Sequence, residues 1–217
     1  MATIHKNVLL VEGKQEVRTI PEIIEANGIH WGTSKNPVVY IIDNEGCSNL
    51  IDPDLITIEL QVRGRSALGI LLDADDTPFG RWESIKNACR KTKSIPDLPK
   101  ELPEEGLICE AFNGVKFGVW LMPDNRINGM LETFLACMIP DETEALWQFA
   151  QSSVKEATNQ GANFTEFQRD KANIYTWLAW QNPPGRQLHQ AVMEKILDPT
   201  HPNAQKFVQW FRDLYGL

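Results

Sequence analysis

Three carboxylates follow directly on an apolar run in the middle of the chain. Residues 67–72 are apolar or Gly, and Asp73, Asp75 and Asp76 come next. A short run without a polar face is typical of a strand buried on both sides. Side chains alternate along a strand, so Asp73 and Asp75 share one side if the chain stays extended. Carboxylates this close repel each other unless a cation lies between them, and hard oxygen ligands favour Mg²⁺ or Mn²⁺ over Zn²⁺.

A second acid has the same kind of setting. Glu12 follows the apolar residues 8–11 and precedes Gly13, which allows a sharp turn into the next element. In an open parallel sheet, ligands bind outside the carboxyl ends of the strands. Gly13-Lys14 lacks the first Gly and the Ser or Thr of a nucleotide-binding P-loop, so that motif is excluded. Because Asp is also common in helix caps and turns, a plain cap and turn is the alternative for the central acids.

The elements that would position these acids alternate along the first 90 residues. Apolar strand-like runs at 8–11, 38–42 and 67–72 are each followed by a helical pattern, at 17–27, 48–62 and 80–91. This alternation predicts an α/β fold with a mostly parallel central sheet flanked by helices. Asn113-Gly114 separates two further strand-like runs and predicts an antiparallel hairpin, at least one strand of which joins the sheet.

The rest of the chain has a helical pattern, with Asp141 expected to cap one of the helices. We expect one domain over residues 1–217, with a core of about residues 7–140 and a helical carboxyl-terminal part of about 141–217. No apolar run is long enough to span a membrane and the amino terminus lacks a signal core, so a cytoplasmic protein without membrane contact is expected.

Composition narrows the functional classes. The formal net charge of −8 argues against a general nucleic-acid coat, but it is compatible with a nuclease in which a metal ion contacts the phosphate. The four cysteines are scattered and form no Cys-x-x-Cys pair, which argues against a zinc ribbon or a thioredoxin-like site.

Two segments together resemble the motifs of the Toprim domain. Residues 8–16, Val-Leu-Leu-Val-Glu-Gly-Lys-Gln-Glu, resemble the first motif, in which Glu and Gly follow an apolar strand. Residues 71–75, Leu-Leu-Asp-Ala-Asp, resemble the second, an apolar strand that ends in Asp-x-Asp. Each motif alone is weak, but their order and the single strand between them fit the Toprim layout. The resemblance covers about residues 7–140 and implies that Glu12, Asp73 and Asp75 bind metal.

Two later segments are similar to the Toprim nucleases of the OLD family. Gly129-Met130-Leu131-Glu132 is similar to their acidic helix start, which makes Glu132 a further metal ligand, and Lys171 is similar to their helical Lys. The structural alternatives are a first-turn helix residue for Glu132 and a solvated helix face for Lys171. Asp76 is either a further member of the metal site or the cap of the next helix. The 217 residues hold no ATPase part like that of the OLD family, so a homodimer or a separate ATPase is an expected partner.

The resemblance implies a Mg²⁺- or Mn²⁺-dependent nuclease that cuts nucleic acid, more readily DNA than RNA. Glu12, Asp73, Asp75 and Lys171 would be catalytic, with Lys171 neutralising transition-state charge and Glu12 binding metal or transferring a proton. The expected metal ligands are Glu12, Asp73, Asp75, Asp76 and Glu132.

Two other readings of the sequence are open. One is a non-catalytic Toprim-like binding or regulatory module that works with a partner. The other is a phosphatase of the haloacid dehalogenase type, because Asp73, Asp75 and Thr77 also fit Asp-x-Asp-x-Thr with Asp73 as nucleophile. That family expects a later Gly-Asp pair, which is absent from the sequence, and its Asp pair usually comes near the start of the domain.

Overall fold

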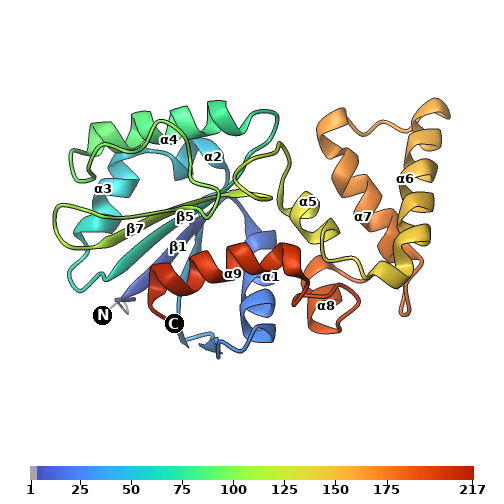
Figure 1. The fold of residues 1–217 in the computed structure, drawn as a ribbon, viewed down its shortest axis with the longest axis horizontal. Helices are drawn as coiled ribbons and strands as arrows, with labels where there is room; N and C mark the ends of the chain where they lie inside the picture. The colour runs from blue at the N-terminus through green and yellow to red at the C-terminus, as the bar shows by residue number, and fades with distance from the viewer. Residues whose placement is uncertain (1–3) are drawn as a thin grey trace.

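A five-stranded sheet lies at the centre of the fold (Figure 1). The computed structural model describes residues 4–217 and has the strand order β4-β1-β5-β7-β6. The strands are β1 (Asn7–Val11), β4 (Tyr40–Asp43), β5 (Ala67–Asp73), β6 (Leu107–Glu110) and β7 (Lys116–Met122). Neighbouring strands are parallel except β6, which pairs antiparallel with β7. The predicted α/β fold with a mostly parallel sheet is confirmed, and so is the hairpin.

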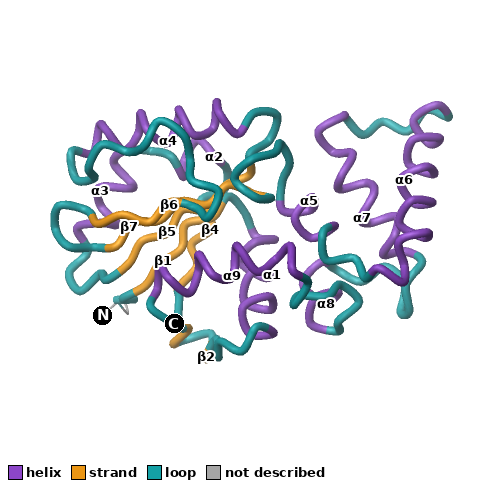
Figure 2. Tube along the Cα trace, viewed as in Figure 1, coloured by secondary structure: helices purple, strands orange, loops and turns teal. Residues whose placement is uncertain are grey.

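Helices cover both faces of the sheet, as Figure 2 shows. One face packs against α1 (Lys14–Ala26) and α9 (Pro202–Tyr215), and the other against α2 (Cys47–Leu50), α3 (Pro53–Gln61) and α4 (Pro78–Thr92). Side chains alternate along β5, so Leu71 packs on the first face and its neighbours Ile70 and Leu72 pack on the second. The central strand is therefore apolar on both sides, as its sequence predicts.

Close packing of α9 depends on two glycines. A Cβ added at Gly69 of β5 would collide with Tyr215 and Leu214 of α9, and one at Gly118 of β7 would collide with Leu214. The carboxyl-terminal helix thus lies directly on the middle of the sheet, far along the sequence from the strands that it covers.

The other helices lie beyond the carboxyl ends of the parallel strands (Figure 1). They are α5 (Leu131–Ala136), α6 (Glu144–Asn159), α7 (Arg169–Ala179) and α8 (Leu188–Met193), with short 3-10 helices η1 (Asp141–Thr143) and η2 (Glu166–Gln168). Helix α7 packs against α5 and α6, and α8 packs against α1. A small separate hairpin joins β2 (Gly32–Thr33) and β3 (Asn36–Pro37).

Two local predictions are wrong. The helix expected over residues 48–62 is two helices, because the Asp52 side chain caps a new helix that starts at Pro53. Asp141 does not cap α6; it begins η1, and α6 starts at Glu144 without a side-chain cap. Within residues 4–217, no helix has the length and apolar character needed to cross a membrane.

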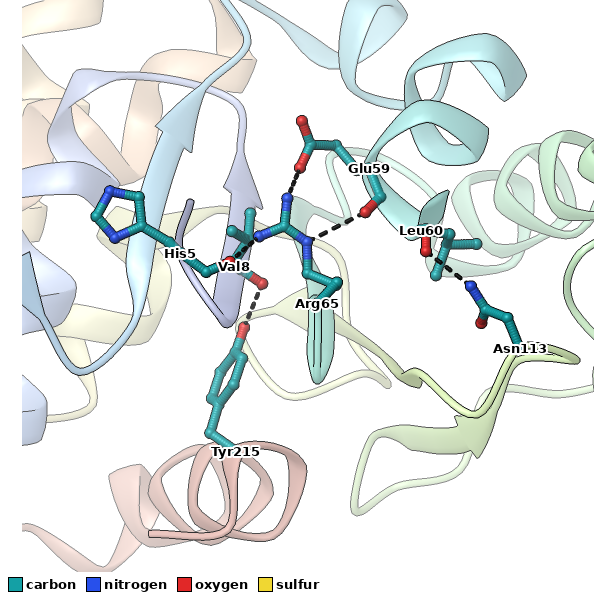
Figure 3. Close-up of polar contacts among 7 residues, drawn as sticks. All are labelled: His5, Val8, Glu59, Leu60, Arg65, Asn113 and Tyr215. Carbon is teal, nitrogen blue, oxygen red and sulfur yellow. Dashed lines mark hydrogen bonds and ion pairs between the residues drawn. The ribbon is translucent and has the colours of Figure 1, made fainter. Parts of the chain in front are cut away.

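Hydrogen bonds close the amino-terminal edge of the sheet (Figure 3). Arg65, just before β5, pairs with Glu59 and donates to the carbonyl oxygens of Glu59 and His5. The Tyr215 hydroxyl donates to the Val8 carbonyl oxygen at 2.9 Å. The Arg65 guanidinium is buried, and a carboxylate and two carbonyl groups accept its hydrogen bonds.

Candidate functional site

Two of the predicted acids meet at the opposite, carboxyl-terminal edge of the sheet. Glu12 follows β1, Asp73 ends β5, and these strands are neighbours. The Glu12 Oε1 atom accepts a hydrogen bond from the Asp73 backbone N–H at 3.0 Å. The structure therefore brings together acids that are 61 residues apart in the chain.

A second contact links the central strand to α5. The Asp73 Oδ1 atom accepts from the Leu131 backbone N–H at 2.9 Å, at the first residue of that helix. The next residue, Glu132, is buried, and its Oε1 atom lies 3.2 Å from Lys171 Nζ on α7. The Thr133 hydroxyl donates to Asp170 Oδ2 at 2.5 Å beside this pair. Glu132 and Lys171 are thus in contact with each other, one residue from the hydrogen bond to Asp73.

Asp75 is oriented differently from the expectation for an extended chain. Its φ of 50° is in the left-handed region, and its backbone exchanges two hydrogen bonds of 2.9 Å with Gly129. Its carboxylate pairs with Arg81 of α4, which also donates to Cys47 Sγ. Since the chain turns here, Asp73 and Asp75 have different partners rather than the shared side that an extended strand would give them.

Asp76 is separate from these contacts. Its side chain is exposed and has no hydrogen bond or ion pair within residues 4–217. The alternative that Asp76 caps the next helix is wrong, because Thr77 Oγ1 accepts from the Gly80 backbone N–H at 2.9 Å and caps α4.

Glu16 is a buried acid that sequence reasoning missed. It lies in the first turn of α1, where burial raises the pKa of its carboxyl to about 7, with further contributions from the charges of Glu12, Glu132 and Asp43. A Glu three residues after a helix cap is common, so its position in the first turn was the only signal in the sequence.

Burial and mutual repulsion raise the pKa values of acids in this group. Burial raises the pKa of the Glu12 carboxyl, against the lowering effect of the hydrogen bond from Asp73. Burial raises the pKa of Asp73 well above its usual value, and the charges of Glu16, Glu12, Glu132 and Asp75 raise it further. We call these five residues, Glu12, Glu16, Asp73, Asp75 and Glu132, the acid cluster.

Two cations contact the acid cluster. Arg81, which sequence reasoning missed, pairs with Asp75, and Lys171 pairs with Glu132. Burial lowers the pKa of Lys171, but the charge and hydrogen bond of Glu132 outweigh this effect and raise the pKa above its usual value, so the ammonium stays charged. In the described part of the chain, no Lys or Arg pairs with Glu12, Glu16 or Asp73. Negative charge is therefore only partly compensated.

The oxygen donors suit a hard divalent cation. Glu12 and Asp73 each use one carboxylate oxygen for a backbone hydrogen bond, which leaves Glu12 Oε2 and Asp73 Oδ2 without a hydrogen bond among the described residues. Mg²⁺ commonly takes one or two protein carboxylates and keeps several waters. Within residues 4–217, no three His, Cys, Asp or Glu side chains are close enough to hold one ion together. The structure therefore suits an ion bound by two carboxylates and water molecules. Metal binding by Asp75, Asp76 and Glu132 stays a prediction.

Comparisons with known proteins identify a family. A family model described as "Protein of unknown function (DUF3226)" matches residues 6–216. No curated protein matches the chain. Among solved structures, the chain is similar to the C-terminal region of the Burkholderia pseudomallei OLD protein, with 12% identity and a TM-score of 0.47 over 98% of this chain and 100% of that one.

Proposed function

We propose that this chain, which belongs to the DUF3226 family, is a Mg²⁺- or Mn²⁺-dependent enzyme that cleaves phosphodiester bonds in nucleic acid, more readily DNA than RNA. The observation that carries the proposal is the contact of Glu12 with Asp73 inside the acid cluster. Clustered acids with raised pKa values at a sheet edge are typical of functional sites. The resemblance of the two strand ends to the Toprim motifs adds support, because those motifs supply the same two residues.

Each residue has a distinct role in this proposal. Glu12 and Asp73 would hold the ion through their free oxygens, with Asp75 and Glu132 adding negative charge around it. A divalent ion there supplies Lewis-acid stabilisation of phosphate charge and lowers the pKa of a bound water. Lys171 is the cation that would neutralise charge on the phosphate in the transition state.

Hydrolysis also requires proton transfer. Water adds to phosphorus and loses a proton, while the bond to the leaving sugar oxygen breaks and that oxygen gains a proton. A group titrating near the working pH is most effective for such transfers. Glu16, with a pKa of about 7, has a suitable value. Glu12 is the alternative, and it would then transfer the proton in place of binding the ion.

The test is cleavage of plasmid DNA and of bis(p-nitrophenyl) phosphate in Mg²⁺ or Mn²⁺. We expect Asp73→Asn to lose activity by about 100-fold or more, because the charge is removed from the centre of the acid cluster. Asn keeps an acceptor for the Leu131 N–H, so the fold should persist. Asp97→Asn, which changes an exposed acid in the loop between α4 and β6, is the matched control. Absence of cleavage by the wild type, or equal cleavage by both variants, would contradict the proposal.

A non-catalytic nucleic-acid-binding module is the second candidate. It is favoured by the Arg81–Asp75 and Lys171–Glu132 ion pairs, because these side chains compensate two of the five acids without a metal ion. This candidate predicts that the protein binds a nucleic-acid strand but does not cleave it in the presence of Mg²⁺ or Mn²⁺. Measuring binding and cleavage on the same protein samples therefore distinguishes the two functions.

A further inference from the structure

Two adjoining hollows lie beside the acid cluster. Each has a volume of about 450 Å³, and both are lined by Asp75, Asp76 and Phe167. One continues along the start of α5 to Thr133 and Arg169, and the other along the first turns of α4 to Arg81. Together they form a groove, which we call the Phe167 groove. It borders Asp75 of the acid cluster and also Met130 and Thr133, which flank Leu131 and Glu132 in the sequence.

Phe167 lies at the junction of the two hollows and is unusually exposed. Its relative exposure is 54%, although it belongs to the short helix η2 rather than to a loose loop. The Thr165 backbone N–H donates to Gln168 Oε1 at 3.0 Å across this turn. Directly after it, Asp170 and Lys171 attach α7 to α5. These contacts hold the segment that carries Phe167, while the ring itself is not packed into the core.

Other features of the groove suit a strand with both bases and phosphates. Ile127, a second exposed apolar side chain, lines the same hollow as Phe167. Arg169 and Arg81 lie in different hollows, where each pairs with an acid, Glu166 or Asp75. Arginine forms two parallel hydrogen bonds with a phosphate as readily as with a carboxylate, so phosphates can replace these acids.

The charge of the groove argues against a duplex. Binding a duplex depends on neutralising many phosphates with a basic surface, whereas this chain has a net charge of −8 and the groove is lined by four acids, Asp75, Asp76, Glu166 and Asp170, beside two arginines. An unpaired strand also carries phosphates, but base stacking on Phe167 would supply part of its binding, so that it depends less on charge than a duplex does. Aromatic stacking on bases is independent of sequence, but it needs a base whose face is not already covered by its neighbours.

We propose that the Phe167 groove binds unpaired nucleic acid, with a base stacked on Phe167 and phosphates on Arg81 and Arg169. Resting on the proposed function, this makes single-stranded or locally unpaired nucleic acid the substrate class. Phe167 is a positioning residue, because it holds the strand while the acid cluster acts on a neighbouring phosphodiester.

The experiment measures binding and turnover separately. Fluorescence anisotropy of a labelled oligothymidylate and of a matched hairpin duplex is measured in Mg²⁺ in the cleavage-silent Asp73→Asn background. Adding Phe167→Ala should weaken strand binding about tenfold, and Phe167→Trp should restore it. In the otherwise wild-type enzyme, Phe167→Ala should raise KM for the oligonucleotide with kcat retained. The matched control is Phe112→Ala, because Phe112 is 72% exposed and lies near the other end of the sheet, next to the start of β7.

The outcomes separate this inference from the proposed function. Binding of the oligonucleotide could depend on Phe167 while the wild type does not cleave bis(p-nitrophenyl) phosphate. This result would support nucleic-acid binding in the Phe167 groove and contradict the proposed enzymatic activity. Cleavage by the wild type with equal strand affinity in the Phe167→Ala and Phe112→Ala variants would overturn the inference alone. A preference for the duplex, or no strand binding by the protein, would also overturn it.

Discussion

Buried charge is compensated by nearby partners at one end of the sheet and is only partly compensated at the other end. At the amino-terminal edge, Arg65 is paired with Glu59 and its other N–H groups reach backbone carbonyl groups (Figure 3). At the carboxyl-terminal edge, burial and the charges of four other carboxylates raise the pKa of Asp73, and only two cations contact the cluster among the described residues. The first arrangement stabilises the fold. The second costs stability, which is expected where a site is shaped for a ligand.

The largest effect on stability is expected from removing the Arg65–Glu59 ion pair at the amino-terminal edge. Arg65→Met leaves Glu59 without its partner in a mostly buried position and should lower the free energy of unfolding by about 3–5 kcal/mol. Urea denaturation measures this loss. The control is Arg186→Met, which breaks a more exposed pair with Glu194 and should cost at most about 1 kcal/mol. Equal losses in the two variants would show that the amino-terminal edge has no special structural role.

Glu16→Gln should have a smaller effect on the free energy of unfolding, and it should raise it. The pKa of Glu16 rises from 4.5 to about 7 on folding, so its favourable contribution is full below pH 4.5 and is lost as the pH rises through 7. The variant should therefore be more stable than the wild type by about 2–3 kcal/mol at pH 8 and similar to it at pH 4. Thermal or urea unfolding across this range tests the sign. A difference that does not change with pH would contradict the cause that we assign to it.

Asp73→Asn should also stabilise the protein at pH 8, because a pKa raised on folding means that the charged carboxylate is unfavourable in the folded state. The substitution removes the cost of burying a charge and also relieves repulsion from four acids. The weaker hydrogen bond from the Leu131 N–H to a neutral acceptor offsets part of the gain. Urea denaturation of Asp73→Asn beside Asp97→Asn measures the difference. A clear loss of stability in Asp73→Asn would mean that this carboxylate is mainly structural.

Sequence patterns predicted the sheet and part of the site for physical reasons that are local. The apolar runs before Glu12 and Asp73 identify buried strands, and acids at parallel strand ends meet at one edge. Asn113-Gly114 fixes the hairpin because its residues favour the turn. The contact between Glu132 and Lys171 was not predicted as a pair, although both residues were named.

What was missed depends on the packing of distant segments. Arg81 looks like any polar residue of an amphipathic helix until α4 places it beside Asp75. Glu16 looks like an ordinary first-turn residue until α5 brings Glu132 to the same edge. The left-handed turn at Asp75 accompanies its pairing with Gly129, a residue 54 positions later, which no local pattern reveals.

The smallest expected effect on stability comes from binding a divalent ion. An ion present at several times its Kd should stabilise the folded protein by about 1 kcal/mol. Ion binding nevertheless tests the difference between the two ends of the sheet most directly. Isothermal titration calorimetry with Mg²⁺ and Mn²⁺ measures it on the wild type, Asp73→Asn and Asp97→Asn. We expect saturable binding by the wild type and by Asp97→Asn, and none by Asp73→Asn. Binding that survives in Asp73→Asn, or is absent from the wild type, would contradict a cation site at the carboxyl-terminal edge.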